Sequence, residues 1–73
     1  MELSPHLLKR MIDRSFTEMD LRRMLHNALG CHRDVVEGRW VIETRHKRRS
    51  WEVIVEPDAN IRILVVVTAY AVW

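Results

Sequence analysis

The chain has 73 residues, 48% of them hydrophobic, which is enough for one small domain around a single core. Its one cysteine, Cys31, excludes an internal disulfide, and no Cys/His spacing resembles a zinc site. No signal peptide or membrane span is visible, because the longest apolar run, within residues 63–72, is short and rich in β-branched residues. We therefore expect a cytoplasmic protein without metal or cofactor.

A short helix is predicted to begin at the serine–proline pair near the start of the chain. Ser4 can accept hydrogen bonds from the free N–H groups of a first helical turn, and Pro5 fits that turn. His6 and Arg10, four residues apart, then share one face, with Arg14 just beyond. A different face is apolar and comprises Leu7, Leu8, Met11 and Ile12.

A second helix is predicted between Thr17 and Gly30, with a signal at each end. Thr17 and Asp20 have the spacing of a capping box, and Phe16 and Leu21 have that of a hydrophobic staple. Gly30 is expected to end the helix, because glycine tolerates the left-handed backbone found there. An apolar stripe at helical spacing lies between these signals: Leu21, Met24, Leu25, Ala28 and Leu29.

Three strands are predicted in the second half of the chain. Residues 31–38 are interpreted as a connection with a turn at Glu37 and Gly38, and from Arg39 apolar residues recur with a period of two. The next strand covers residues 51–56, and residues 57–60 form a turn. The last run, 61–73, ends at Trp73 and is apolar on both faces. We expect a single α+β domain, 1–73, with two N-terminal helices on a three-stranded antiparallel meander (α-α-β-β-β).

The bend between the first two predicted strands concentrates positive charge. Residues 45–49 hold four cations and a histidine and no acid, and the acids follow only after the bend. A hairpin tip of this kind is often only solvated, and its charges discourage pairing of sheet edges. Binding of a polyanion such as the RNA backbone is the other interpretation, because clustered cations attract phosphates.

The order of these segments resembles a known family. "SPHLLKRMIDRSFTEMDLRRML", "GRWVIETRHKRRSWEVIVEPD" and "ILVVVTAY" are similar to small bacterial proteins of the DUF4258 type, which look like compact relatives of the RelE/ParE toxin superfamily with its BrnT-like ribonucleases. The resemblance implies a RelE-like fold of helices on an antiparallel sheet and, in some members, RNA cleavage. ParE-like members act on a protein instead. This chain departs from the pattern by having no clear strand before the first helix.

Metal-independent RNA cleavage needs a proton acceptor, a proton donor and cations that neutralise the phosphate. Histidine, carboxylate and tyrosine side chains can transfer the protons, and the arginine fork matches phosphate oxygens. The resemblance implies that a tyrosine near the chain end donates a proton or orients a phosphate. The catalytic candidates are His6 or Glu43 as base and His46 or Tyr70 as acid. The candidates for binding RNA phosphates are Arg10, Arg14, Arg45, Lys47, Arg48 and Arg49.

Each candidate also has an interpretation without catalysis. His6 and Arg10 fit the exposed polar face of a surface helix. Glu43 fits an ion pair across two strands, and Tyr70 fits a sheet edge with a solvated hydroxyl. Trp51 can stack on a base, but its alternation with apolar residues favours the core.

Two functions follow from these alternatives. The first is a toxin-like ribonuclease that binds RNA, has a cognate antitoxin or immunity protein as partner, and does not bind membranes. The second is a non-catalytic interaction module that pairs with a partner, or with itself as a homodimer, through the apolar C-terminal strand. The first requires the cations of the first helix and of the bend to converge on one surface.

Overall fold

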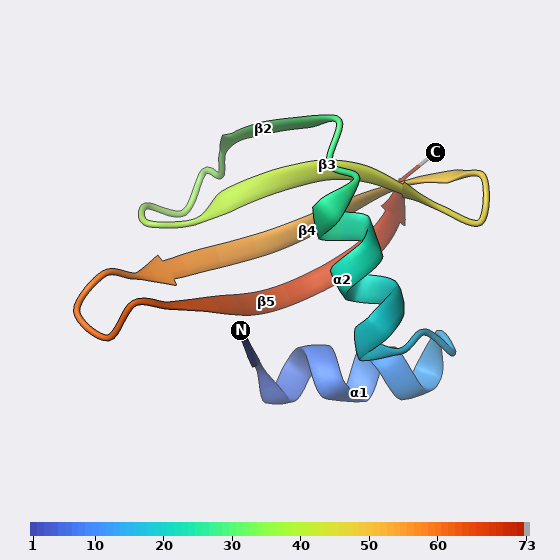
Figure 1. Ribbon diagram of the computed structural model, residues 1–73, viewed down its shortest axis with the longest axis horizontal. Helices are drawn as coiled ribbons and strands as arrows, with labels where there is room; N and C mark the ends of the chain where they lie inside the picture. The colour runs from blue at the N-terminus through green and yellow to red at the C-terminus, as the bar shows by residue number, and fades with distance from the viewer. Residues whose placement is uncertain (73) are drawn as a thin grey trace.

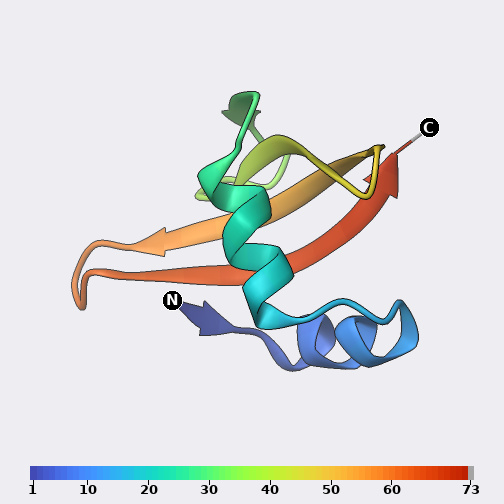
Figure 2. The same cartoon turned by 45° about the vertical axis from the view of Figure 1, so that its right-hand side comes forward.

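The computed structural model describes residues 1–72 and has two helices over one face of a five-stranded mixed sheet (Figures 1 and 2). The elements in chain order are β1 (Glu2–Leu3), α1 (Pro5–Asp13), α2 (Glu18–His26), β2 (Gly30–Arg33), β3 (Trp40–His46), β4 (Arg49–Asp58) and β5 (Ile63–Val72). The strand order in the sheet is β1-β5-β4-β3-β2. β1 pairs parallel with β5, whereas the other neighbours are antiparallel. Trp73, predicted to end the last strand, lies outside the described residues.

The predicted three-stranded meander is wrong, because two further strands form the edges of the sheet. β1 precedes the first helix, where no strand was expected, and pairs only with Val65 and Val66. Its two residues are too few for any alternating pattern. β2, expected to be part of a connection, is polar and largely exposed at the other edge, so it lacks the apolar alternation of a half-buried strand.

α1 begins where the sequence predicts and is tied to the sheet at its first turn. The Ser4 hydroxyl accepts a hydrogen bond from the Leu7 N–H at 3.1 Å. The same hydroxyl donates to the Val67 carbonyl of β5 at 2.5 Å, and the Ser4 N–H donates to the Val66 carbonyl at 3.0 Å. The helix cap therefore also positions α1 beside β5, where Figure 1 shows the two running next to each other.

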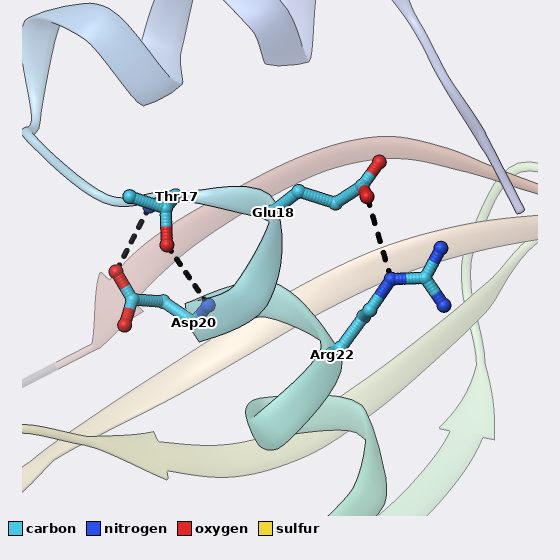
Figure 3. Close-up of polar contacts among 4 residues, drawn as sticks. All are labelled: Thr17, Glu18, Asp20 and Arg22. Atoms are coloured by element: carbon cyan, nitrogen blue, oxygen red, sulfur yellow. Dashed lines mark hydrogen bonds and ion pairs between the residues drawn. The ribbon is translucent and has the colours of Figure 1, made fainter.

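α2 begins with the predicted capping box but ends earlier than predicted. The Asp20 N–H donates to the Thr17 hydroxyl at 3.1 Å, and the Thr17 N–H donates to the Asp20 carboxylate at 2.9 Å (Figure 3). Asn27, not Gly30, caps the C-terminus, and Leu29 is 72% exposed. The Leu29 N–H already donates to the Glu43 carbonyl, so the backbone has joined the sheet before the apolar stripe is complete.

We expect Thr17→Ala to lower the free energy of unfolding by about 1 kcal/mol, because the N-terminal N–H groups of α2 lose their acceptor. Urea denaturation followed by circular dichroism measures this. Arg22→Ala is the matched control on the same helix, since it removes only an exposed ion pair with Glu18 at 3.4 Å (Figure 3) and should change stability by roughly 0.5 kcal/mol or less. Equal losses in both variants would show that the cap contributes nothing beyond surface helix propensity.

The core lies between the helices and the middle of the sheet. The helices and the connection between them contribute Leu7, Phe16, Leu21 and Met24, and the sheet contributes Trp51, Val53, Val55, Val66 and Ala69. Phe16 and Trp51 pack edge to face with ring centroids 5.2 Å apart. The buried Thr44 hydroxyl donates to the Met24 carbonyl at 2.6 Å, which holds the end of α2 on β3. Trp51 is 8% exposed, so the core interpretation of this residue is the correct one.

β5 contains one extra residue relative to β4. Ile54 pairs with Thr68 but the next residue, Val55, pairs with Val66, so Val67 has no counterpart and forms a β-bulge. The core-facing side chains of β5 are therefore Val66 and Ala69, which are three residues apart and not two, as they would be in a regular strand. This irregularity accounts for the absence of a clear alternation in the last apolar run.

The β3–β4 hairpin turns at two residues, Lys47 and Arg48, and His46 pairs with Arg49 across its base. Both tip residues have positive φ angles, 51° and 67°, as a two-residue hairpin turn of type I′ requires. The predicted basic bend is therefore a tight hairpin, and Arg49 is the first residue of β4.

Candidate phosphate-binding cleft

A cleft of about 440 Å³ lies where the C-terminal end of α1 faces the start of β4 and the end of β5. Figure 1 shows these ends on the same side of the molecule. The helix contributes Arg10 and Arg14, and the hairpin contributes Arg49. The complete lining is Arg10, Asp13, Arg14, Ser15, Arg49, Trp51, Tyr70 and Ala71. Cations of the first helix and of the basic bend thus share one concave surface.

The three arginines give this cleft a net positive lining, because Asp13 is its only carboxylate. Arg10 is half-buried, and its Nε is buried without a hydrogen-bond partner among the described residues. A buried guanidinium N–H without an acceptor costs free energy unless another group, such as a phosphate oxygen, accepts it. Arg14 and Arg49 are more exposed and lie at the same opening. This arrangement is suited to an anion with several oxygens.

Tyr70 lines one end of the cleft, but its hydroxyl is directed to the other face of the sheet. The hydroxyl donates to Oε1 of Glu52 on the neighbouring strand at 2.7 Å. Glu52 alternates with the core-facing Trp51 and Val53, so this pair lies on the helix-free face. The hydrogen bond to a carboxylate, with some desolvation, raises the pKa of Tyr70 to about 12. The hydroxyl therefore keeps its proton at neutral pH but does not face the three arginines.

A second hollow of about 340 Å³ adjoins the cleft along α1. It is lined by His6, Lys9, Arg10, Asp13 and Arg14. Three of these residues also line the cleft, so one basic surface continues from His6 to Arg49. A nucleic acid strand has room for neighbouring phosphates along such a surface.

The other predicted site residues lie outside the cleft. His46 packs edge to face against Trp51, with ring centroids 5.5 Å apart. Lys47 and Arg48 form the hairpin tip. Glu43 and Arg45 alternate with the core-facing Thr44 on β3 and so belong to the helix-free face of the sheet.

On that helix-free face Glu43 has its own partners. It lies opposite Glu52 on β4, and its Oε1 is 3.4 Å from Nδ1 of His32. Gly30 lies directly opposite Glu43 on β2, beneath the Glu43 side chain. A Cβ atom added at Gly30 would come within 2.9 Å of a Glu43 carboxylate oxygen, so this position has no room for a side chain. Glu43 therefore reaches Tyr70 only through Glu52.

Two residues, one in the cleft and one bonded to Tyr70, were missed by sequence reasoning. Asp13 is three positions from Arg10 on α1, so helical spacing was a sufficient signal for it. Glu52 contacts Tyr70 because of the register between β4 and β5, which no short-range pattern shows.

Neither helix within residues 1–72 is long and apolar enough to cross a membrane. In the same part of the chain, no three His, Cys, Asp or Glu side chains are grouped in a way that could hold a metal ion.

Comparison with known families gives one match. The model of a domain of unknown function, DUF4258, matches residues 3–71, which is nearly the whole chain. No curated protein and no solved structure matches, and a place among the RelE-like toxins stays a prediction.

Proposed function

The chain belongs to the DUF4258 family, and we propose that it is a toxin-like ribonuclease that cleaves RNA without a metal ion. The observation that supports this proposal is the convergence of Arg10, Arg14 and Arg49 in one cleft. Three guanidinium groups can neutralise the charge that accumulates on a phosphate during cleavage.

The proposed reaction uses groups that line the cleft. The carboxylate of Asp13 takes the proton of a ribose 2′-hydroxyl, whose oxygen attacks the adjacent phosphorus. The bond from phosphorus to the 5′-oxygen breaks, and that oxygen takes up a proton from water. The products are a 2′,3′-cyclic phosphate and a 5′-hydroxyl, and the proton held by Asp13 returns to the solvent. His6, at the far end of the neighbouring hollow, contacts a flanking phosphate.

The partners follow from the same surface. We expect the protein to act in the bacterial cytoplasm, and to be held inactive by an antitoxin or immunity protein whose acidic side chains cover the three arginines of the cleft. Expression of the chain alone should slow growth, and coexpression of that partner should restore it.

The proposal is tested by incubating total RNA with the purified protein and its arginine variants. We expect Arg49→Ala and Arg10→Ala each to slow cleavage roughly tenfold or more, because each removes a charged donor to the phosphate. Arg49→Lys should keep part of the activity. Arg62→Ala is the matched control, since this exposed arginine is in the β4–β5 turn and does not line the cleft. Intact RNA with the wild-type protein, or equal losses in all variants, contradicts the proposal.

A second function is favoured by the outer edge of β5. β1 covers this edge only at Val65 and Val66, so residues 68–72 pair on that side with no other strand of the part described. An extended segment of another chain, or of a second copy, can add there as a further strand. Concentration-dependent dimerisation with intact RNA would support this interaction module over the ribonuclease.

A further inference from the structure

A third hollow, of about 470 Å³, is formed by the connection between β2 and β3. It shares no lining residue with the phosphate-binding cleft. In Figures 1 and 2 this connection lies at the end of β3 away from the β3–β4 hairpin, from which Arg49 reaches the cleft. Its lining is Arg33, Asp34, Val35, Glu37, Gly38, Arg39 and Trp40. We call it the Trp40 pocket.

The Trp40 pocket has a platform for a flat ring. Trp40 is half-buried at the border of the core, which fixes its indole while leaving part of it accessible. The guanidinium carbon of Arg33 lies 5.6 Å from the centre of that ring. Nucleobases stack on aromatic rings and on arginine planes, and each such stack is worth roughly 1–3 kcal/mol. Tryptophan and arginine here offer both kinds of surface.

The charges of the Trp40 pocket fit a neutral ligand better than a phosphate. Two arginines are balanced by two acids, Asp34 and Glu37, so the lining has no net charge. The Nε of Arg39 is buried and has no hydrogen-bond partner among residues 1–72, which leaves a donor for an acceptor on a ligand. Asp34 accepts a hydrogen bond from the Val35 N–H through Oδ1. Its second oxygen and the carboxylate of Glu37 are the acceptors that the lining offers a ligand.

We propose that the Trp40 pocket binds a guanine base. Guanine presents acceptors, O6 and N7, that match an arginine fork, and donors, N1–H and the N2 amino group, that match a carboxylate. Arg39 contacts the acceptor edge, Asp34 or Glu37 contacts the donor edge, and the ring stacks on Trp40. Taken with the proposed ribonuclease function, on which this part rests, the pocket selects RNA with a guanine near the cleaved phosphate.

Calorimetric titration of the full chain with GMP and IMP tests this assignment. IMP differs from GMP only by lacking the N2 amino group, so it should bind at least about fivefold more weakly, having lost a hydrogen bond to a carboxylate. Arg39→Ala should weaken GMP binding about tenfold or more and abolish the preference over IMP. Arg62→Ala is the matched control, because this exposed arginine lies in the β4–β5 turn and does not line the pocket.

The result that overturns the assignment is GMP binding that is absent, equal to IMP binding, or lost in Arg49→Ala but not in Arg39→Ala, since the last would place the nucleotide in the phosphate-binding cleft. The two proposals fail separately. Selective GMP binding without RNA cleavage removes the ribonuclease and leaves the guanine pocket. Cleavage without selective GMP binding, at sites unchanged by Arg39→Ala, removes only the pocket.

Discussion

Replacing Leu7 with alanine should lower the free energy of unfolding by about 3 kcal/mol, within the range of roughly 2–5 kcal/mol for buried leucines. Leu7 is 0% exposed and is the one fully buried side chain of α1 among the described residues. A domain of this size has only a few kcal/mol to lose, so a large fraction of the variant should be unfolded in modest denaturant. Urea denaturation at 25 °C, monitored by circular dichroism, measures the change.

Leu8→Ala is the control for this experiment. Leu8 is the next residue of the same helix, has the same side chain and is 47% exposed, so the substitution should cost less than about 1 kcal/mol. If Leu7→Ala and Leu8→Ala had the same effect, burial of α1 against β5 would not hold the helix in place. The support that this burial gives to Arg10 and Arg14 would then also be lost.

Replacing Tyr70 with phenylalanine should change the rate of RNA cleavage less than about threefold, because its hydroxyl bonds to Glu52 on the helix-free face, away from the arginines of the cleft. RNA binding should also stay close to that of the wild type, since those arginines remain. Single-turnover cleavage and equilibrium binding, measured on the same RNA, separate the two effects. A large loss of rate with unchanged binding would instead assign the Tyr70 hydroxyl to proton transfer.

The pH dependence gives an independent check on Tyr70. Because its pKa is raised to about 12, the hydroxyl stays protonated through the neutral and mildly alkaline range. The hydrogen bond to Glu52 should stabilise the fold fully below the unfolded pKa of 10.0 and lose this effect as the pH rises through about 12. Tyr70→Phe should remove that alkaline dependence.

Local signals in the sequence were sufficient for the starts of both helices and for the hairpin. Ser4, and the pair Thr17 and Asp20, make the predicted hydrogen bonds because capping depends on residues within one turn. The end of α2 was not predictable in this way, since Leu29 leaves the helix to bond with the distant Glu43. The edge strands were missed because pairing with β5 and β3, not their own pattern, creates them.

The candidate site was predictable in its residue types but not in its geometry. Arg10, Arg14, Arg49 and Tyr70 were all selected from the sequence, and they line one cleft. The same reasoning also selected Glu43, which alternation of β3 turns to the helix-free face. Which of the cations in the basic bend reach the cleft depends on the two-residue hairpin tip, where Arg48 lies at the turn and Arg49 begins β4.

The unpaired Val67 has a consequence for the polarity of the strand that follows it. If Val67 instead paired regularly opposite Ile54, the strand would keep a strict period of two from Val66 onward, and the side chains of residues 68–72 would exchange sides of the sheet. The phenol of residue 70 would then be directed at the helices, and the small methyl groups on either side of it would face solvent. A single bulge thus decides on which surface this chain displays its aromatic hydroxyl.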